Sequence, residues 1–230
     1  MKGPFDLEAF TLDIAHDRPW RANPDYDALV DRMWEKRVVD AKARNHHLWD
    51  GTHYRLLDPA ELAGRGPLHV GTVSFRYLAT WQLLQAEHAA HKLDPFHHVS
   101  VASLLHTAND DYVFGKRALN GAIDLIGGGF QKEGGVQTFA DNFRKEIQEE
   151  LGVTPDRLGP LTGLGIVRAA NSNVLVIADV PARLTNDELL AAFERREDNE
   201  MAAPVFVPAA ELTRFLLGLT SYRRLIPQLL

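Results

Sequence analysis

Three glutamates fall within five residues in the segment KEIQEELGV, at positions 146, 149 and 150. The apolar residues around them recur at helical spacing, which predicts a helix over 138–151 that ends at Gly152. At about 100° per residue, Glu150 falls inside the apolar arc of this helix, Glu146 at its edge and Glu149 roughly 60° outside it. A carboxylate on a partly buried face is costly unless it is paired or binds a cation.

The spacing of the glutamates suits a divalent cation. Residues at i and i+4 lie one above the other on a helix, so Glu146 and Glu150 can converge on one ion, while Glu149 binds a second ion or orients water. Ligand sets made only of oxygen select a hard cation, which makes Mg²⁺ or Mn²⁺ the expected cofactor. The alternative is a solvated acidic face, because charged runs on helices usually face water.

A glycine-rich run before the helix favours the functional interpretation. Glycine lacks a Cβ, so the backbone of such a loop can approach phosphate or metal closely. Gly128 and Gly129 are the candidate binding positions in this run.

The composition of the 230 residues predicts a globular protein and excludes several functions. The net charge of −6 argues against a nucleic-acid or membrane partner, and a small anionic ligand bridged by metal stays open. The absence of cysteine excludes disulfides, thiolate metal sites and cysteine nucleophiles. Neither a secretory signal nor a membrane span is apparent, so a soluble, cytoplasmic protein is expected. The oligomeric state stays open.

The sequence around the glutamate helix alternates between expected strands and expected helices. This mixture predicts an α/β or α+β sandwich as the fold that positions the glutamate helix. After an irregular opening, the expected helices are 23–44, 77–93, 138–151, 186–197 and 209–216. The expected strands are 53–58, 68–75, 161–170, 173–180 and 204–208, together with a hairpin over 100–118. The stretch 93–98 is the expected boundary between an N-terminal part, 1–97, and the remainder, 98–230.

The segment GGGFQKEGGVQTFADNFRKEIQEELGV, residues 127–153, resembles the Nudix box. That pattern is a glycine, five residues, a glutamate, seven residues, and then Arg-Glu-apolar-x-Glu-Glu-x-Gly-apolar. The closing half matches except at its first position, where Lys145 stands for arginine. Counting back places Gln137 at the family's glutamate and Gln131 at its glycine. In the family the glutamate and arginine brace the loop, an ion pair that Gln137 and Lys145 cannot make.

The resemblance to Nudix hydrolases covers about residues 99–230. It implies a Nudix-type α/β/α sandwich, here with an N-terminal α+β extension, a divalent metal, and hydrolysis of a nucleoside diphosphate linked to another group. It also implies Glu146 and Glu150 as principal metal ligands, with Glu149 sharing metal, and makes Glu149 and Glu146 the expected catalytic residues. A further metal-binding glutamate from a later loop would be Glu200, with Glu197 as second choice.

The N-terminal extension resembles that of the UDP-sugar pyrophosphatases, which split UDP-glucose or UDP-galactose into UMP and sugar 1-phosphate. Three stretches carry this resemblance: WEKR at 34–37, NHHLWDGTHYRLL at 45–57 and LHVGTVSFRYLATW at 68–81. It implies that Tyr54 and Phe75 hold the nucleobase and that Arg117 lies near the diphosphate. The alternative places Tyr54 and Phe75 in the core and Arg117 on the surface.

Two other functions stay open. The chain could be a non-catalytic nucleotide-binding or regulatory protein with a degenerate Nudix box, or a Nudix hydrolase for ADP-ribose or dinucleotides. The histidine pairs at 46–47 and 97–98 lack the spacing of a zinc site and are interpreted as loop residues.

Overall fold

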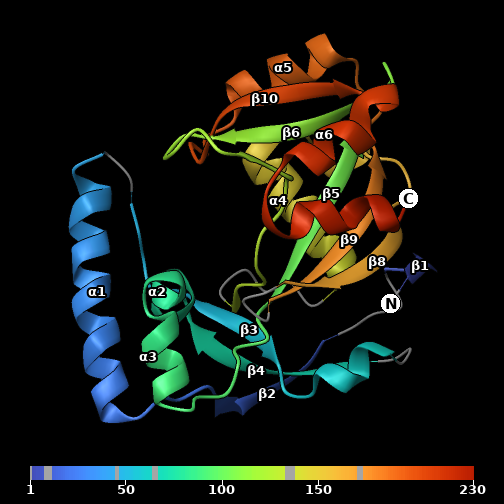
Figure 1. Ribbon diagram of the computed structural model, residues 1–230. Coiled ribbons are helices and arrows are strands. Elements are labelled where there is room, and N and C mark those ends of the chain that lie inside the picture. The colour runs from blue at the N-terminus through green and yellow to red at the C-terminus, as the bar shows by residue number, and fades with distance from the viewer. Residues whose placement is uncertain (1, 8–11, 45–46, 64–66, 133–137, 170–172) are drawn as a thin grey trace.

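The structure is a computed structural model that describes residues 2–7, 12–44, 47–63, 67–132, 138–169 and 173–230. Two sheets with their helices lie next to each other (Figure 1). Each helix within the described ranges is too short or too polar to cross a membrane.

The larger sheet has seven strands in the order β1-β8-β9-β5-β6-β10, with β7 beside β6. Strands β5 and β9 run parallel, and the other neighbours run antiparallel. Its strands are β1 (Lys2–Phe5), β5 (Val99–His106), β6 (Asp111–Arg117), β7 (Ile123–Asp124), β8 (Thr162–Arg168), β9 (Val174–Pro181) and β10 (Met201–Pro208). The pairing of β5 with β6 confirms the predicted hairpin.

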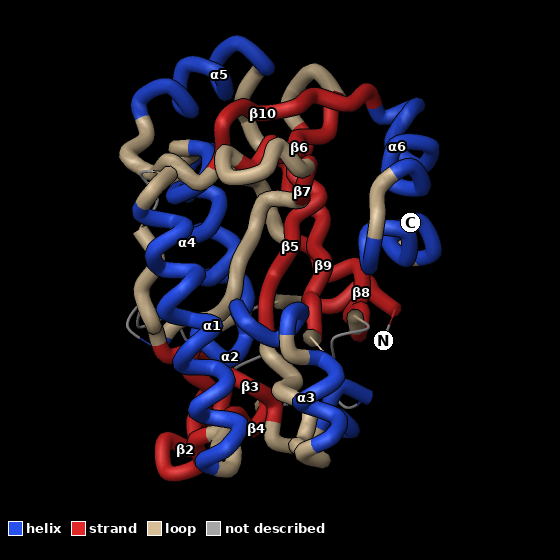
Figure 2. The backbone as a smooth tube through the Cα atoms, turned by 60° about the vertical axis from the view of Figure 1, so that its left-hand side comes forward, coloured by secondary structure: helices blue, strands red, loops and turns tan. Residues whose placement is uncertain are grey.

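Helices cover both faces of the larger sheet (Figure 2). One face carries α4 (Phe139–Leu151) and α5 (Asn186–Arg195), and the other carries α6 (Leu212–Gly218) and the 3-10 helix η6 (Ser221–Gln228). Strand β9 shows why both faces are covered, because it carries apolar side chains on each. Val174 and Val176 belong to the core under α4, and Ile177 belongs to the core under α6. A strand buried on both faces has an unbroken apolar sequence rather than an alternating one. The expected α/β/α layering is confirmed.

The smaller sheet belongs to the N-terminal region and has the order β2-β4-β3. Its strands are β2 (Leu12–Pro19), β3 (Thr52–Leu56) and β4 (Leu68–Ser74), and the helices of this region are α1 (Pro24–Lys42), α2 (Phe75–Thr80) and α3 (Gln85–Ala90). The helix predicted over 23–44 is confirmed as α1, whose N-cap Asn23 accepts a hydrogen bond from Tyr26 N at 3.0 Å.

Three sequence-based expectations about the N-terminal region are wrong. The irregular opening contains β1 and β2, and β1 pairs with β8 of the larger sheet. The strand predicted over 68–75 ends at Ser74, so that Phe75 begins α2. The helix predicted over 77–93 is divided, because the Thr80 hydroxyl donates to the carbonyl of Arg76 and Leu84 has non-helical dihedral angles.

Candidate functional site

Helix α4 has a capping residue at each end. The Oγ1 of Thr138 accepts a hydrogen bond from Asp141 N at 3.1 Å, and Gly152 ends the helix with a φ of 70°. Between these caps, Phe139, Phe143 and other apolar side chains face the core. The helix is therefore fixed in rotation about its axis, which decides where its glutamates point.

Glu146 and Glu150 lie on the buried side of α4, with 8% and 4% of their surface exposed, whereas Glu149 is exposed. The inward direction predicted for Glu150 from the helical period is confirmed. Burial raises the pKa of Glu150 to about 8, although Arg117 and the N–H of Gly127 stabilise its ionised form. Burial likewise raises the pKa of Glu146 to about 7.

The glycine run contacts both buried carboxylates. The N–H of Gly127 donates to Oε2 of Glu150 at 2.9 Å. A Cβ on Gly128 would overlap the carboxylate of Glu146, so that any larger residue there would require this side chain to move. Loop and helix thus form one unit around Glu146 and Glu150.

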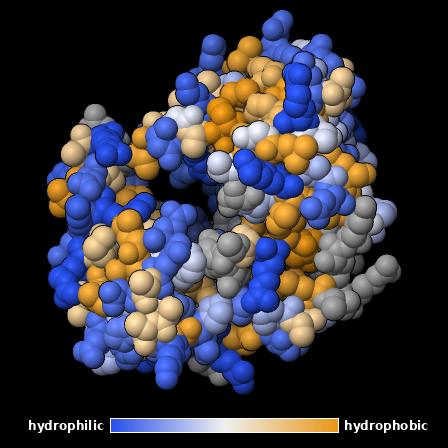
Figure 3. All heavy atoms as spheres, in the orientation of Figure 1, coloured by the Kyte–Doolittle hydropathy of each residue, from blue (hydrophilic) through white to orange (hydrophobic). Residues whose placement is uncertain are grey.

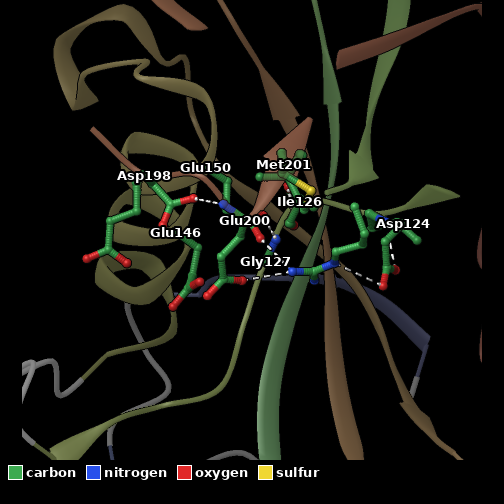
Figure 4. Close-up of polar contacts among 12 residues, drawn as sticks. Asp124, Ile126, Gly127, Glu146, Glu150, Asp198, Glu200 and Met201 are labelled. Carbon is green, nitrogen blue, oxygen red and sulfur yellow. Dashed lines mark hydrogen bonds and ion pairs between the residues drawn. The ribbon is translucent and has the colours of Figure 1, made fainter. Parts of the chain in front are cut away.

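Arg117, near the end of β6, joins three acidic segments. Its Nη1 lies 3.3 Å from Oε1 of Glu150 and 3.0 Å from Oε2 of Glu200, and its Nε lies 3.8 Å from Oδ2 of Asp124. In Figure 4, Glu146 and Glu150 project from α4 toward the side on which Glu200 lies. Tertiary folding therefore brings Glu200, remote in sequence, beside the helix glutamates, as expected.

Arg117, Glu146, Glu150 and Glu200 line a cavity of about 310 Å³. Its lining includes seven of the predicted site residues, namely Phe75, Arg117, Gly128, Gly129, Glu146, Glu150 and Glu200. The N-terminal region supplies a second wall, with Leu48, Trp49 and His53 among its residues. The cavity is therefore built jointly by the two sheets.

Two predicted site residues do not reach this cavity. Tyr54 is 3% exposed and packs in the main core, because successive residues of β3 face opposite sides and it is His53 that faces the cavity. Glu149 points away from the cavity and pairs with Lys145, whose Nζ lies 2.6 Å from its Oε2. Glu197, the second choice for a later glutamate, lines a different surface pocket together with Glu149.

Lys145 replaces the arginine of the Nudix pattern and contacts two glutamates of its own helix. Besides Glu149, its Nζ lies 3.3 Å from Oε1 of Glu146. Burial alone would lower the pKa of Lys145, but the two carboxylates raise it. Gln137, the expected counterpart of Lys145 in the loop brace, lies outside the described residues.

The sequence interpretation missed a pair of histidines, of which His53 lines the cavity and His98 lies behind it. Nδ1 of His53 lies 3.1 Å from Nε2 of His98, and the ring of His53 stacks on Phe75 with 5.1 Å between centroids. Burial, followed by the proximity of His53, lowers the pKa of His98 to about 3, so His98 is neutral at physiological pH. The alternation of β3 offers a signal, since a strand that buries Tyr54 must turn His53 to the other face.

The acidic group suits a divalent cation by its chemistry. Among the residues that the structure describes, three carboxylates, from Glu146, Glu150 and Glu200, line the cavity, and Arg117 is the one lysine or arginine that lines it with them. A hard cation bound by these oxygens would offset the cost of burying Glu146 and Glu150 in ionised form. In the described part of the chain, no three acidic or histidine side chains already stand in a metal-binding arrangement.

Comparisons with known proteins show similarity at the level of fold. No protein-family model matches the sequence, and no curated protein matches it significantly. Several solved structures of the Nudix class are similar to the chain.

One is a Nudix hydrolase from Nitrosomonas europaea, with 14% identity, a TM-score of 0.39, and coverage of 57% of this chain and 84% of that one. Another is the Nudix domain of Shewanella oneidensis NrtR in complex with ADP-ribose, with 19% identity, a TM-score of 0.42, and coverage of 63% and 95%. A third is the MutT protein of Methanosarcina mazei, with 17% identity, a TM-score of 0.41, and coverage of 57% and 91%. The activity or ligand named for each is a property of that protein.

Proposed function

We propose that this protein hydrolyses the diphosphate bond of a nucleoside diphosphate linked to another group, in the manner of Nudix hydrolases and with Mg²⁺ or Mn²⁺. The observation that carries the proposal is the pair of buried carboxylates, Glu146 and Glu150, packed against the glycine loop. Buried acids at i and i+4 are expensive for a fold that gains nothing from them.

The position of each residue in the cavity suggests its role in the proposed reaction. Glu146, Glu150 and Glu200 would hold the metal, which when bound neutralises the diphosphate and lowers the pKa of water. Arg117 presents a guanidinium to the same cavity and can donate hydrogen bonds to phosphate oxygens. Of the two glutamates proposed to activate water, Glu146 is favoured over Glu149 because only Glu146 lines the cavity.

A UDP-sugar that yields UMP and sugar 1-phosphate is the proposed substrate. The stack of Phe75 on His53, with Trp49 in the same wall, supports recognition of a planar base. Phe75 keeps its proposed role as a base-binding residue, and His53 takes the place proposed for Tyr54. ADP-ribose and dinucleotides offer the same chemistry at the diphosphate and are the alternatives within this activity.

The test is incubation with Mg²⁺ and a panel of UDP-sugars, ADP-ribose and dinucleotides, with release of nucleoside monophosphate as the readout. Glu146→Gln and Glu150→Gln should each lower turnover at least about a hundredfold, with an unchanged circular dichroism spectrum. Glu149→Gln should lower turnover far less, because its side chain points away. A larger loss in Glu149→Gln than in Glu146→Gln would contradict the assignment of roles.

A second candidate is a nucleotide-binding protein without turnover. It is favoured by Arg117, whose guanidinium already contacts the carboxyl groups of Glu150 and Glu200, and by Lys145, which contacts Glu146. For this candidate, no substrate of the panel would release product, while UDP or ADP-ribose would still bind in calorimetry.

A further inference from the structure

A second cavity, of about 330 Å³, lies against α1. Three of its lining residues are cationic and come from that helix and the residues after it, namely Lys36, Arg37 and Arg44. Among the described residues, Asp40 is the one acid that lines it, and the other lining residues are apolar, namely Met33, Ala41, Leu48, Leu83 and Leu119. The cavity therefore combines an excess of positive charge with apolar walls, in a protein whose net charge is −6.

The cationic side chains of this cavity are not paired with other side chains in the part of the chain that the structure describes. Within the described ranges, Lys36, Arg37 and Arg44 form no side-chain hydrogen bond and no ion pair with a carboxylate. Nε of Arg37 is buried and has no hydrogen-bond partner among the same residues. Arginines elsewhere, such as Arg117 and Arg157, pair with carboxylates. Unpaired cations gathered around one cavity suit an anionic ligand.

The second cavity lies next to the first at two segments of the chain. Leu48 lines both cavities. Arg117 lines the first and Leu119, two residues further on, lines the second, a separation of at most about 7 Å along the chain. Figure 3 shows the molecule hollowed between the α1 side and the side that carries β6. One extended ligand can therefore occupy both cavities.

We infer that the second cavity binds a further anionic group of the substrate, a phosphate or a carboxylate carried on the part that lies beyond the diphosphate. This inference rests on the proposed function only in placing the diphosphate in the first cavity. The guanidinium of Arg37 and the charges of Lys36 and Arg44 recognise the anion, and Leu48, Leu83 and Leu119 contact the apolar surface of the group that bears it. The ligand class is a nucleotide with one more negative group than a simple nucleoside diphosphate ester.

The test uses two pairs of ligands that differ in a single anionic group. ADP-ribose is compared with its derivative that carries a phosphate on the terminal ribose, and UDP-glucose with UDP-glucuronate, in calorimetry at physiological ionic strength. We expect the more anionic member of at least one pair to bind about tenfold more tightly, which corresponds to about 1.4 kcal/mol. The first pair reports on a phosphate and the second on a carboxylate.

Substitutions test whether the preference for the more anionic ligand depends on the second cavity. Arg37→Gln and Arg44→Gln should abolish it, while Arg32→Gln should retain it, since Arg32 is exposed on the same helix and does not line the cavity. Circular dichroism checks that each variant folds. If Arg37→Gln does not fold, the result for Arg44→Gln, a substitution at an exposed position, is the test of the inference. Equal affinities within both pairs, or a preference that survives in Arg37→Gln and Arg44→Gln, would overturn the inference. A preference that depends on Arg37 without hydrolysis of any substrate would retain the anion site and reject the proposed function.

Discussion

The carboxyl group of Glu150 is held in an environment that favours its protonated form. Its folded-state pKa is about 8 against an ordinary value of 4.5, with burial as the main cause. Between these two values the unfolded chain releases the proton and the folded chain keeps it. The free energy of unfolding of the metal-free protein therefore falls as the pH rises through this window, and the contribution of Glu150 is fully lost above it.

Replacing Glu150 with glutamine should remove this dependence. In the presence of EDTA, we expect Glu150→Gln to gain stability relative to the wild type as the pH rises from 5 to 8, by roughly 3 kcal/mol at the upper end. Urea denaturation at the two pH values measures the difference. Addition of Mg²⁺ should stabilise the wild type more than the variant. Glu211→Gln, at an exposed position, is the control and should leave the pH dependence unchanged.

Gly128 sets the position of the other buried carboxylate. Because a Cβ at this residue would lie 2.3 Å from Oε2 of Glu146, Gly128→Ala should displace that carboxylate and lower metal affinity and turnover roughly tenfold to a hundredfold. Mg²⁺ titration followed by calorimetry, together with the hydrolysis assay, measures both effects. Gly218→Ala is the matched control, since its Cβ would meet no atom within 4 Å. Equal effects of the two substitutions would refute this role of Gly128.

At the scale of elements, the local sequence that starts α4 also determines where its glutamates lie in the candidate site. Its N-cap Thr138 directly follows the glycine-rich segment, and its apolar face fixes the direction of Glu146 and Glu150. The N-terminal end of this helix should therefore matter both to stability and to the cavity.

Thr138→Ala removes the side-chain hydrogen bond to Asp141 N and should cost about 1 kcal/mol in the free energy of unfolding. We also expect a measurable loss of Mg²⁺ affinity, because fraying of the first turn loosens the helix that positions Glu146 and Glu150. Thr185→Ala removes the equivalent cap of α5, where Thr185 accepts from Glu188 N at 3.3 Å. This second variant should cost similar stability and leave Mg²⁺ affinity unchanged, and a loss of affinity in both variants would contradict the expected coupling.

At the scale of the whole molecule, the N-terminal residues close one edge of the larger sheet. Strand β1 pairs with β8, where Phe5 lies opposite Gly163 and packs on the main core. A Cβ on Gly163 would lie 2.5 Å from the ring of Phe5, so this glycine makes room for the aromatic side chain. The chain's first strand is thus an integral part of the sheet that carries the candidate site.

Truncation of this contact tests the role of β1. Phe5→Ala should lower the free energy of unfolding by about 2 kcal/mol, because a half-buried aromatic ring is lost from the core. Nucleotide affinity should stay unchanged, since Phe5 does not line either cavity. Urea denaturation and calorimetry measure the two quantities. Leu217→Ala is the control for an apolar residue that is 53% exposed, and a comparable loss of stability there would reject the structural role of Phe5.

Local chemistry made much of the molecule predictable. The caps at Asn23 and Gly152, the hairpin over 100–118 and the inward direction of Glu150 each depend on neighbours a few residues away, so the sequence contains the whole reason for them. The apolar pattern over 77–93 did not show that the helix is divided at Leu84, whose dihedral angles are non-helical.

The sequence by itself determined the acidic helix and its rotation toward the core, because the helical period expresses burial directly, while the α/β/α layering was expected from the resemblance to Nudix hydrolases. The tertiary structure alone decided that Arg117 joins Glu150 to Glu200, and that His53 rather than Tyr54 faces the cavity. It also decided that β1 completes the larger sheet. These facts depend on the pairing of segments far apart in the chain, and a period of two allows either face of a strand until its neighbours are in place.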